Sequence, residues 1–423
     1  MTLGLQRLRL WWENASWVIP LAGIVGAAAL SQAIVQLDQD VADPERGLLS
    51  ASSAQTLLSA IGGGMVTFTG FVFSVVLLVI QFGSSAYSPR TVTYFMRARS
   101  TQWVLACFLG TVTFSFLTLF SIGSGRQESF VPFFGTATAV LLLVLSLVGF
   151  LVLISSVSTR IKVDALHTSI GAMARRRLRR RHAAATGRGA RPEEPDDDLA
   201  IEGGVVVRYA GRPGQLVAVS VGHLGRLVRR DGVHVRVLVR VGDGVSVGSP
   251  IALVAAADAR PSDRELSRCL LVRHERSLAH DPLYALRLLT DVALKALSPG
   301  INDPTTAVRS LDEVEGVLRV AAALPLGAAV IDAGRGSVQL RGATWADVVD
   351  LALLEVVEAG ISQPQVTRRL SALLADLIAD LPVALHAPLV RHTRRLTDEV
   401  RAAHPRDHEL WLTGDRQGLG GSR

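Results

Sequence analysis

The chain has 423 residues, of which 49% are hydrophobic and 19% are charged, and its formal net charge at pH 7 is +7. This length exceeds what a single hydrophobic core usually organises, so we expect more than one domain. The two cysteines, Cys107 and Cys269, exclude a disulfide framework and a cysteine-based metal site, which is typical of a protein in a reducing compartment.

The first 155 residues contain four strongly apolar stretches without a charged residue or a histidine. A helix rises about 1.5 Å per residue, so about 20 apolar residues match the roughly 30 Å hydrocarbon core of a bilayer. Buried helices of soluble proteins rarely repeat that length without a charge. The sequence therefore predicts an α-helical membrane protein whose transmembrane domain covers residues 1–160. The four expected spans are residues 17–37, 57–82, 103–122 and 131–155.

The segments between the apolar stretches differ in charge. Lys and Arg resist translocation, so segments rich in them stay in the cytoplasm. Basic residues precede the first stretch, separate the second from the third and follow the fourth: Arg7, Arg9, Arg90, Arg97, Arg99, Arg160 and Lys162. Carboxylates dominate the loop after the first stretch: Asp38, Asp40, Asp43 and Glu45. This pattern predicts that both termini are cytoplasmic.

A cleaved signal peptide is an alternative interpretation of the first apolar stretch, because Arg7 and Arg9 precede it. The stretch is long for a signal peptide, and three further stretches follow it. We therefore expect the first helix to remain in the protein.

A dense basic cluster follows the fourth stretch. Beside a membrane, such a cluster favours anionic lipid headgroups over nucleic acid as the partner. Residues 182–198 lack periodicity and are expected to form a tether, so we interpret residues 161–199 as a basic juxtamembrane segment and linker. The candidate headgroup-binding residues are Arg175, Arg176, Arg177, Arg179, Arg180 and Arg181.

The second stretch is unusually rich in glycine and hydroxyl residues, which permit close contact between helices. Alternatively, these residues line a water-filled path, together with hydroxyls of the third stretch or without them. The absence of ionisable residues at depth argues against a proton-driven transporter, whereas a passive pore formed by several copies is compatible with it. The candidates for packing or pore lining are Gly63, Gly64, Thr67, Gly70, Ser74 and Gln81. The hydroxyl residues of the third stretch are Thr111, Thr113, Ser115 and Thr118.

Two distinctive strings lie far apart in the chain: FSVVLLVIQFGSSAYSPR at residues 73–90 and ALSPGINDPTTA at residues 296–307. With these strings, and from about residue 17 to about residue 404, the chain resembles a family of bacterial predicted membrane proteins classed as a domain of unknown function. The resemblance implies a bacterial inner-membrane protein with N-terminal spans and a cytoplasmic remainder. It implies no particular activity.

The second half of the chain contains a region with the periodicity of strands, followed by a region with the periodicity of helices. Alternating apolar and polar residues predict a small β-domain over residues 200–260, with a turn at residues 242–250 similar to that of lipoyl-type domains but without a carrier lysine. Residues 261–410 are expected to be helical, interrupted by a hairpin near residues 334–336, and residues 411–423 form a disordered tail. The expected helix starts are marked by Ser262 with Glu265, Asp281 with Pro282, Asp303 with Pro304, Thr344 with Asp347, Pro364 and Pro388.

The loop at residues 298–306 has two interpretations. In the first, it ends one helix and Asp303 caps the next. In the second, the donors of the new helix N-terminus bind an anion such as a phosphate, or the loop couples neighbouring subunits. The residues concerned are Ser298, Gly300, Asn302, Asp303, Thr305 and Arg309.

Catalytic and metal-binding motifs are missing from the sequence. His274, Glu275, His280 and Asp281 are poorly aligned for a shared metal, so we expect them to be solvated surface. With no phosphate loop, nucleophile elbow or paired-cysteine motif, the sequence predicts neither an enzyme nor a bound cofactor. We expect a homo-oligomeric, channel-like membrane protein with a cytoplasmic gating or sensing domain. The alternative is a membrane-anchored scaffold or sensor without transport; a membrane-bound hydrolase would need a catalytic constellation that the sequence does not provide.

Overall fold

The chain forms two compact units, Met1–Lys162 and Val163–Arg423. The computed structural model describes residues 17–40, 50–86, 99–122, 131–161, 163–186, 191–193, 204–255, 261–274, 276 and 281–415.

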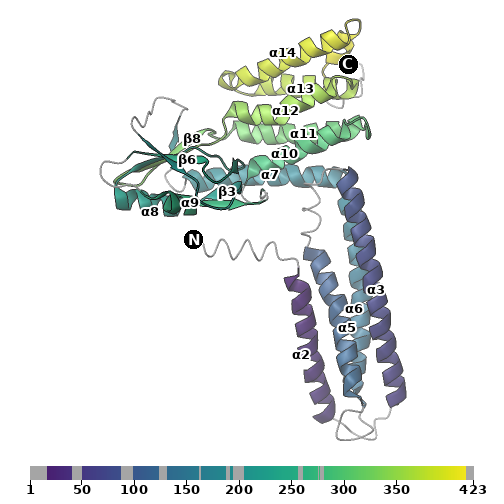
Figure 1. Ribbon diagram of the computed structural model, residues 1–423. Coiled ribbons are helices and arrows are strands. Elements are labelled where there is room, and N and C mark those ends of the chain that lie inside the picture. The colour runs from purple at the N-terminus through teal and green to yellow at the C-terminus, as the bar shows by residue number, and fades with distance from the viewer. Residues whose placement is uncertain are drawn as a thin grey trace. The chain divides into compact units, whose positions relative to one another are not determined.

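The first unit is a bundle of long helices (Figure 1). They are α2 (Val18–Asp40), α3 (Ala51–Ala86), α5 (Arg99–Ser121) and α6 (Phe133–Ile161). Each is long and apolar enough to cross a membrane, and each matches one of the four predicted spans to within two residues at the ends it leaves uncovered. The prediction of four N-terminal apolar helices is therefore confirmed.

Helices α2 and α5 approach each other through small residues. A Cβ added to Gly23 of α2 would lie 2.6 Å from the carbonyl oxygen of Ala106 in α5. Four residues further along each helix, a Cβ on Gly110 would lie 3.6 Å from the Cβ of Ala27. Small residues four apart allow two backbones to come this close. This α2–α5 crossing is the tightest helix contact that glycines make in the described part of the bundle.

Aromatic and aliphatic side chains fill the space between α3, α5 and α6. Phe108 and Phe114 of α5 are fully buried, and Leu58 of α3 is buried with them. The ring of Phe68 lies 5.5 Å from that of Phe108 and 4.9 Å from that of Phe150, in tilted and edge-on arrangements that aromatic pairs favour. Helix α3 is therefore packed along one side only.

Hydroxyl groups join the helices inside this bundle. Ser31 of α2 lies 3.1 Å from Thr118 of α5, and Thr111 of α5 lies 2.9 Å from Ser146 of α6. Thr113 instead donates to the carbonyl oxygen of Leu109, in its own helix. Thr111, Thr113 and Thr118 thus bond within the bundle, to neighbouring helices or to backbone carbonyls. The buried hydroxyl of Ser115 has no hydrogen-bond partner among the described residues.

The helices of the second unit form a stack (Figure 1). Helix α7 packs on α10 and α11, which contact α12 and α13, and these contact α14. The helices are α7 (Val163–Thr186), α10 (Pro282–Ala296), α11 (Pro304–Ala322), α12 (Trp345–Gly360), α13 (Pro364–Asp380), η1 (Val383–Leu385), α14 (His386–Ala403) and α15 (His408–Leu412).

Two helices extend into segments that we expected to be irregular. The last turn of α7 includes residues 182–186, where Ala183, Ala184 and Ala185 are strong helix formers. Helix α15 reaches Leu412 because Trp411 stacks on His404 with ring centroids 3.6 Å apart. Helical structure therefore continues to Thr186 and to Leu412, and a strand at Arg191–Glu193 also lies within the expected tether. Residues 416–423 lie outside the described part of the chain.

The strands form two sheets, with orders β1-β8-β9-β4-β6-β2 and β5-β3-β7. Five strands fall within the predicted β-domain: β2 (Val205–Arg208), β3 (Gly214–Val219), β4 (His234–Val237), β5 (Gly244–Val245) and β6 (Pro250–Ala255). The others come from outside it: β1 (Arg191–Glu193), β7 (Leu270–Arg273), β8 (Ala328–Asp332) and β9 (Ser337–Leu340). Two short helices accompany the sheets, α8 (Val221–Asp231) and α9 (Asp263–Arg268).

The hairpin predicted near residues 334–336 is confirmed, since β8 and β9 pair antiparallel across Gly334 at φ +85°. It is not an interruption of a helical domain but an extension of the sheet. Strand β9 pairs parallel with β4, with Val338 opposite Val235, and both valines are buried. A boundary between β and helical domains at residue 260 is therefore not seen, because the sheet core needs side chains from both sides of it.

The expected helix starts are confirmed. Ser262 with Glu265 and Thr344 with Asp347 form complete capping boxes at α9 and α12. Asp281 and Asp303 accept hydrogen bonds from backbone N–H groups in the first turns of α10 and α11, and each is followed by proline at the first helical position. Such caps satisfy donors that a helix start leaves unpaired.

Candidate functional sites

Except for Gly64, the residues proposed for packing or pore lining share one face of α3. That face is exposed and lies opposite the side on which Leu58, Ile61 and Met65 are buried. A helix brings residues three, four and seven positions apart onto the same face, so these residues form a continuous stripe. We call this set the α3 stripe; its exposed members are Ser52, Thr56, Ser59, Gly63, Thr67, Gly70, Ser74 and Gln81.

Four hydroxyl groups of the α3 stripe, those of Thr56, Ser59, Thr67 and Ser74, donate to carbonyl oxygens of their own helix. Thr67 donates to the carbonyl oxygen of Gly63 at 3.3 Å, and Ser74 donates to that of Gly70 at 3.0 Å. A Cβ added to Gly63, or to the neighbouring exposed Gly64, or to Gly70, would meet nothing within 4 Å. The stripe is uncharged and shallow, which suits contact with another helix as well as contact with water.

The loop at residues 298–306 is held by its own hydrogen bonds. The backbone N–H of Asp303 donates to the carbonyl oxygen of Ala296 at 2.8 Å, and Ser298 Oγ donates to that of Lys295 at 2.6 Å. Asn302 adopts φ +49°, a left-handed conformation that asparagine tolerates better than most residues, and its Oδ1 accepts from Gln363 Nε2 at 2.8 Å.

Asp303 also occupies the start of α11. Its carboxylate accepts from the backbone N–H of Thr306 at 3.1 Å and from the Thr306 hydroxyl at 2.6 Å. An anion bound at this helix start would be repelled by the Asp303 carboxylate. Thr305 and Arg309 are exposed, and Arg309 lies 3.8 Å from Asp312. Capping of α11 therefore accounts for the contacts of the Asp303 carboxylate, whereas coupling of the loop to a neighbouring subunit stays a prediction.

The arginine cluster lies on α7 and divides between two faces. Arg175 forms a 2.6 Å ion pair with Glu313 of α11, so this residue is part of the packing of the second unit. On the same packed side, His167 lies 2.7 Å from Ser310, and both side chains are buried. Arg176, Arg179 and Arg180 are exposed on the opposite side, Arg177 is half-buried, and the side chain of Arg181 lies outside the described residues.

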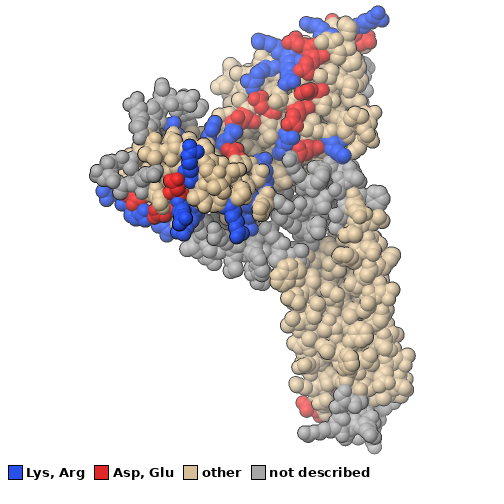
Figure 2. All heavy atoms as spheres, viewed as in Figure 1, with Lys and Arg blue, Asp and Glu red and all other residues tan. Residues whose placement is uncertain are grey.

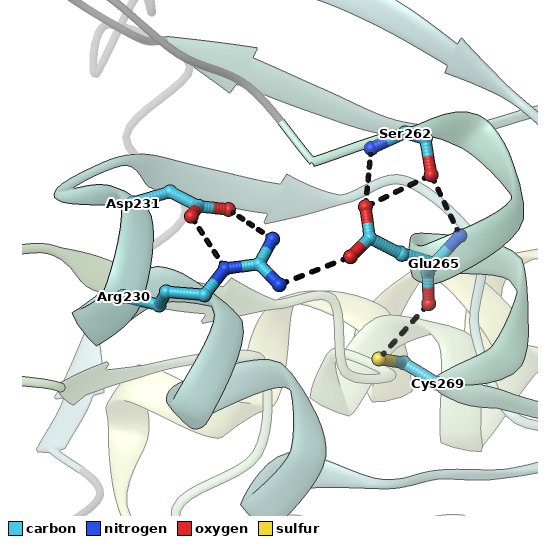
Figure 3. Close-up of polar contacts among 5 residues, drawn as sticks. All are labelled: Arg230, Asp231, Ser262, Glu265 and Cys269. Atoms are coloured by element: carbon cyan, nitrogen blue, oxygen red, sulfur yellow. Dashed lines mark hydrogen bonds and ion pairs between the residues drawn. The ribbon is translucent and has the colours of Figure 1, made fainter.

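Sequence reasoning missed a polar cluster that joins α8 to α9 (Figure 3). The Arg230 guanidinium contacts both oxygens of Asp231, at 2.6 and 2.8 Å, and Glu265 at 3.1 Å. Hydrogen bonds from the backbone and hydroxyl of Ser262, and then the bond from Arg230, lower the pKa of Glu265 to about 2. The capping pair was visible in the sequence, but Arg230 lies too far from it along the chain for any local pattern to connect them.

Cys269 lies beneath this cluster and is buried, with Sγ 3.5 Å from the carbonyl oxygen of Glu265. Burial raises the pKa of its thiol to about 11. Because the thiolate is the reactive form, this cysteine is poorly suited to nucleophilic or redox chemistry.

A buried arginine joins α13 to α11. Arg369 is 4% exposed and contacts Asp312 at 2.8 Å and Glu315 at 2.5 Å. Nearby, between α12 and α14, Asp350 accepts a 2.7 Å hydrogen bond from the buried His392. Burial raises the pKa of Asp350, but hydrogen bonds from His392 and Arg391 outweigh it and lower the pKa below its ordinary value. These contacts serve the packing of the helix stack.

One expectation about the possible metal ligands is wrong. Asp281 is 2% exposed, caps α10 and pairs with Arg276, so it is buried rather than solvated. His274 is exposed, as expected, whereas Glu275 and His280 lie outside the described residues. Among the residues that the structure describes, no group of three or more His, Cys, Asp or Glu side chains is placed to hold a metal ion.

Four apolar helices of membrane-spanning length, followed by a charged α/β unit, define the class of helical membrane proteins. The chain belongs to the family described as "Predicted membrane protein (DUF2254)", whose model matches residues 13–376. It is 26% identical over 381 residues to an uncharacterized protein of Mycobacterium tuberculosis and to one of Mycobacterium bovis, covering 86% of this chain and 71% of each relative. No solved structure matches it. The family resemblance seen in the sequence is therefore confirmed.

Proposed function

We propose that this protein is a multi-pass protein of the bacterial cytoplasmic membrane, with both termini in the cytoplasm. Over the described residues of the first unit, the surface seen in Figure 2 shows no basic side chain and has acidic ones at one end only, as lipid contact requires. Large apolar side chains are exposed along it, including Val25 of α2, Phe120 of α5 and Leu151 of α6. The basic segments before the first span and after the fourth support the orientation.

In the same proposal, the exposed arginines of α7 contact anionic headgroups at the cytoplasmic surface. Arg176, Arg179 and Arg180 face away from α10 and α11, and only Lys162 separates α7 from α6, the helix of the fourth span. Each arginine near such a surface contributes about 1 kcal/mol of attraction. The proposal includes no nucleic-acid partner, no cofactor and no enzymatic reaction.

The α3 stripe supports a homo-oligomeric, channel-like assembly. It lies opposite the packed face of α3, so a neighbouring copy would meet it without disturbing the bundle. Within the bundle, the small residues Gly23 and Gly110 already have a close partner, whereas Gly63 and Gly70 have none among the described residues. A ring of such stripes would surround a narrow, uncharged path, selective by size and hydroxyl groups rather than by charge.

The second unit would regulate this path through α7. This helix is joined to α11 by the Arg175–Glu313 pair and the His167–Ser310 contact, and it follows α6 after Lys162. A ligand or partner that displaced the helix stack would therefore pull on the cytoplasmic end of the fourth span. The loop at residues 298–306 would couple neighbouring copies.

The mass of the protein in detergent, followed by conductance in planar bilayers, tests this function. We expect an oligomer that conducts, and we expect Gly70→Leu to lower both the oligomer mass and the conductance. Gly26→Leu is the matched control, because Gly26 is an exposed glycine of α2 at which an added Cβ also meets nothing within 4 Å. A monomer, or equal effects of the two substitutions, would contradict the proposal.

The second candidate is a membrane-anchored scaffold or sensor that moves no solute. It is favoured by the hydrogen bonds of Thr67 and Ser74, which are complete without water. The same experiment separates the two functions. An oligomer that depends on Gly70 but stays electrically silent would identify a scaffold.

A further inference from the structure

Helix α8 has two distinct faces. Leu224 and Val228 are buried against the sheets, whereas Gly222, Arg226 and Arg229 are exposed on the other side. These three positions are four and three residues apart, so they share one face of the helix. The exposed face of α8 is therefore basic.

Helix α9 repeats the arrangement. Leu266 and Ser267 are buried, and Arg264 and Arg268, which lie one turn apart, are exposed. The Arg230–Glu265 pair, at 3.1 Å, joins α9 to α8. In Figure 2, basic atoms gather over the part of the second unit that Figure 1 labels α8 and α9. We call Arg226, Arg229, Arg264 and Arg268 the α8–α9 basic face.

The carboxylates of the two helices form no ion pair with this basic face. Arg230 contacts both Asp231 and Glu265, so these carboxylates pair with an arginine outside the basic face. Helices α8 and α9 together carry five arginines and three carboxylates, which leaves a net charge of +2. Asp263 accepts a hydrogen bond from the backbone N–H of Arg208. None of the four arginines of the basic face forms an ion pair with another residue in the described ranges. They retain their full charge for an external anionic partner.

We propose that the α8–α9 basic face binds the anionic headgroup surface of the membrane that holds the protein's own spans. The inference rests on the proposed membrane function. The cytoplasmic leaflet carries a negative surface potential, and the second unit is tethered to the fourth span through Lys162. A tether keeps the effective concentration of the lipid surface high, so a few arginines suffice for docking.

The composition of the basic face favours lipid over nucleic acid. Proteins that bind single strands use aromatic side chains as stacking platforms beside their basic residues. The exposed positions of α8 and α9 are Gly222, the arginines and Ser262, and none is aromatic. Headgroup phosphates require only charge and hydrogen-bond donors, which arginine provides.

A fluorescent label on α8 in the full-length protein tests the proposal. The nitrobenzoxadiazole label would be attached to Gly222→Cys, where an added Cβ meets nothing within 4 Å, after Cys107→Ala and Cys269→Ala. In nanodiscs containing equal parts of phosphatidylcholine and phosphatidylglycerol, we expect blue-shifted emission and weaker iodide quenching than in phosphatidylcholine alone. A label at Val383→Cys, which is 81% exposed, should not respond to the lipid.

Substitution of Arg226, Arg229 and Arg268 by Gln should abolish the response. Each arginine that no longer contacts the lipid surface lowers the ratio of docked to undocked protein about fivefold. The three substitutions together therefore lower this ratio by about two orders of magnitude. The matched control replaces three exposed arginines of the helix stack with Gln: Arg394, Arg401 and Arg406. This control changes the net charge equally and should leave the response of the Gly222→Cys label intact.

Three results would overturn the inference. The first is a label emission that does not depend on phosphatidylglycerol. The second is an equal emission response of the two triple variants. The third is an emission shift that an added oligonucleotide causes in phosphatidylcholine nanodiscs and that anionic lipid does not cause. Incorporation into nanodiscs is scored separately. Failure to incorporate would count against the proposed membrane function itself, whereas incorporation without docking would count against the basic face alone.

Discussion

At the scale of single residues, Asn302 shows how the loop at residues 298–306 is specified. Its φ of +49° is unfavourable for β-branched side chains, and its Oδ1 accepts from Gln363. We expect Asn302→Val to destabilise the second unit by about 1–2 kcal/mol beyond the loss of that hydrogen bond. Thermal unfolding of Asn302→Val, Asn302→Gly and Gln363→Ala measures the difference. Glycine accepts this conformation, so equal losses for Val and Gly would contradict a backbone origin.

Glu265 gives a residue-scale prediction about pH. Its pKa is lowered to about 2 from an ordinary value of 4.5, mainly by the bonds from Ser262 and Arg230. A carboxylate whose pKa is depressed on folding stabilises the protein above its unfolded pKa, and this stability is lost as pH falls from about 5 towards 2. We expect the difference in unfolding temperature between wild type and Glu265→Gln to shrink across that range. A difference independent of pH would show that the carboxylate charge contributes nothing; because Glu265 is solvent-accessible, we expect a small effect that salt reduces further.

At the scale of elements, the α2–α5 crossing depends on small residues. An added Cβ at Gly23 would lie 2.6 Å from a carbonyl oxygen of α5. Overpacking at such a contact costs about 1–3 kcal/mol, so we expect Gly23→Leu to destabilise the bundle by that amount in detergent. Gly26→Leu, three residues away on the exposed face, should be close to neutral. Similar losses for the two variants would mean that leucine disturbs α2 itself rather than its packing.

The buried guanidinium of Arg369 in α13 joins this helix to α11. Removing Arg369 takes a buried partner from Asp312 and Glu315, which keep the more exposed Arg309 and Arg319. Breaking a buried pair costs about 3–5 kcal/mol. Asp312 is 38% exposed and regains water, so we expect the lower end of this range for Arg369→Met. Chemical denaturation of the full-length protein measures it. The triple variant Arg369→Met, Asp312→Asn, Glu315→Gln should recover part of the loss, and a triple variant less stable than the single one would refute this account.

At the scale of the whole molecule, the sequence predicted elements better than domains. Apolar length identified the four helices of the first unit, and cap residues such as Asp303 and Thr344 located helix starts, because both signals are local. The sheet was only partly predicted. Strand β9 pairs with β4, which lies far away in the sequence, and local periodicity does not show which distant strands pair. Likewise, the exposed side of Gly70 and the pairing of Arg230 with Glu265 follow from tertiary packing, which no local pattern contains.

The two-unit organisation leads to a final prediction, that residues 163–423 fold without a membrane. This unit has its own apolar core, which includes Val235, Val254 and Val338. We expect the fragment to be soluble and helical, with one cooperative unfolding transition seen by circular dichroism. Helix α7 is essential to it, because Ile170, Ala174 and Leu178 are buried where α7 packs on α10 and α11.

The control for this prediction is a fragment that starts at residue 191 and lacks α7. Its α10–α11 surface loses that apolar cover, and exposed patches of this kind promote aggregation. We expect the shorter fragment to aggregate or to bind a hydrophobic dye, which gel filtration and dye fluorescence measure. If both fragments behave alike, α7 belongs functionally to the membrane spans rather than to the second unit, and a displacement of the helix stack would not reach α6 through it.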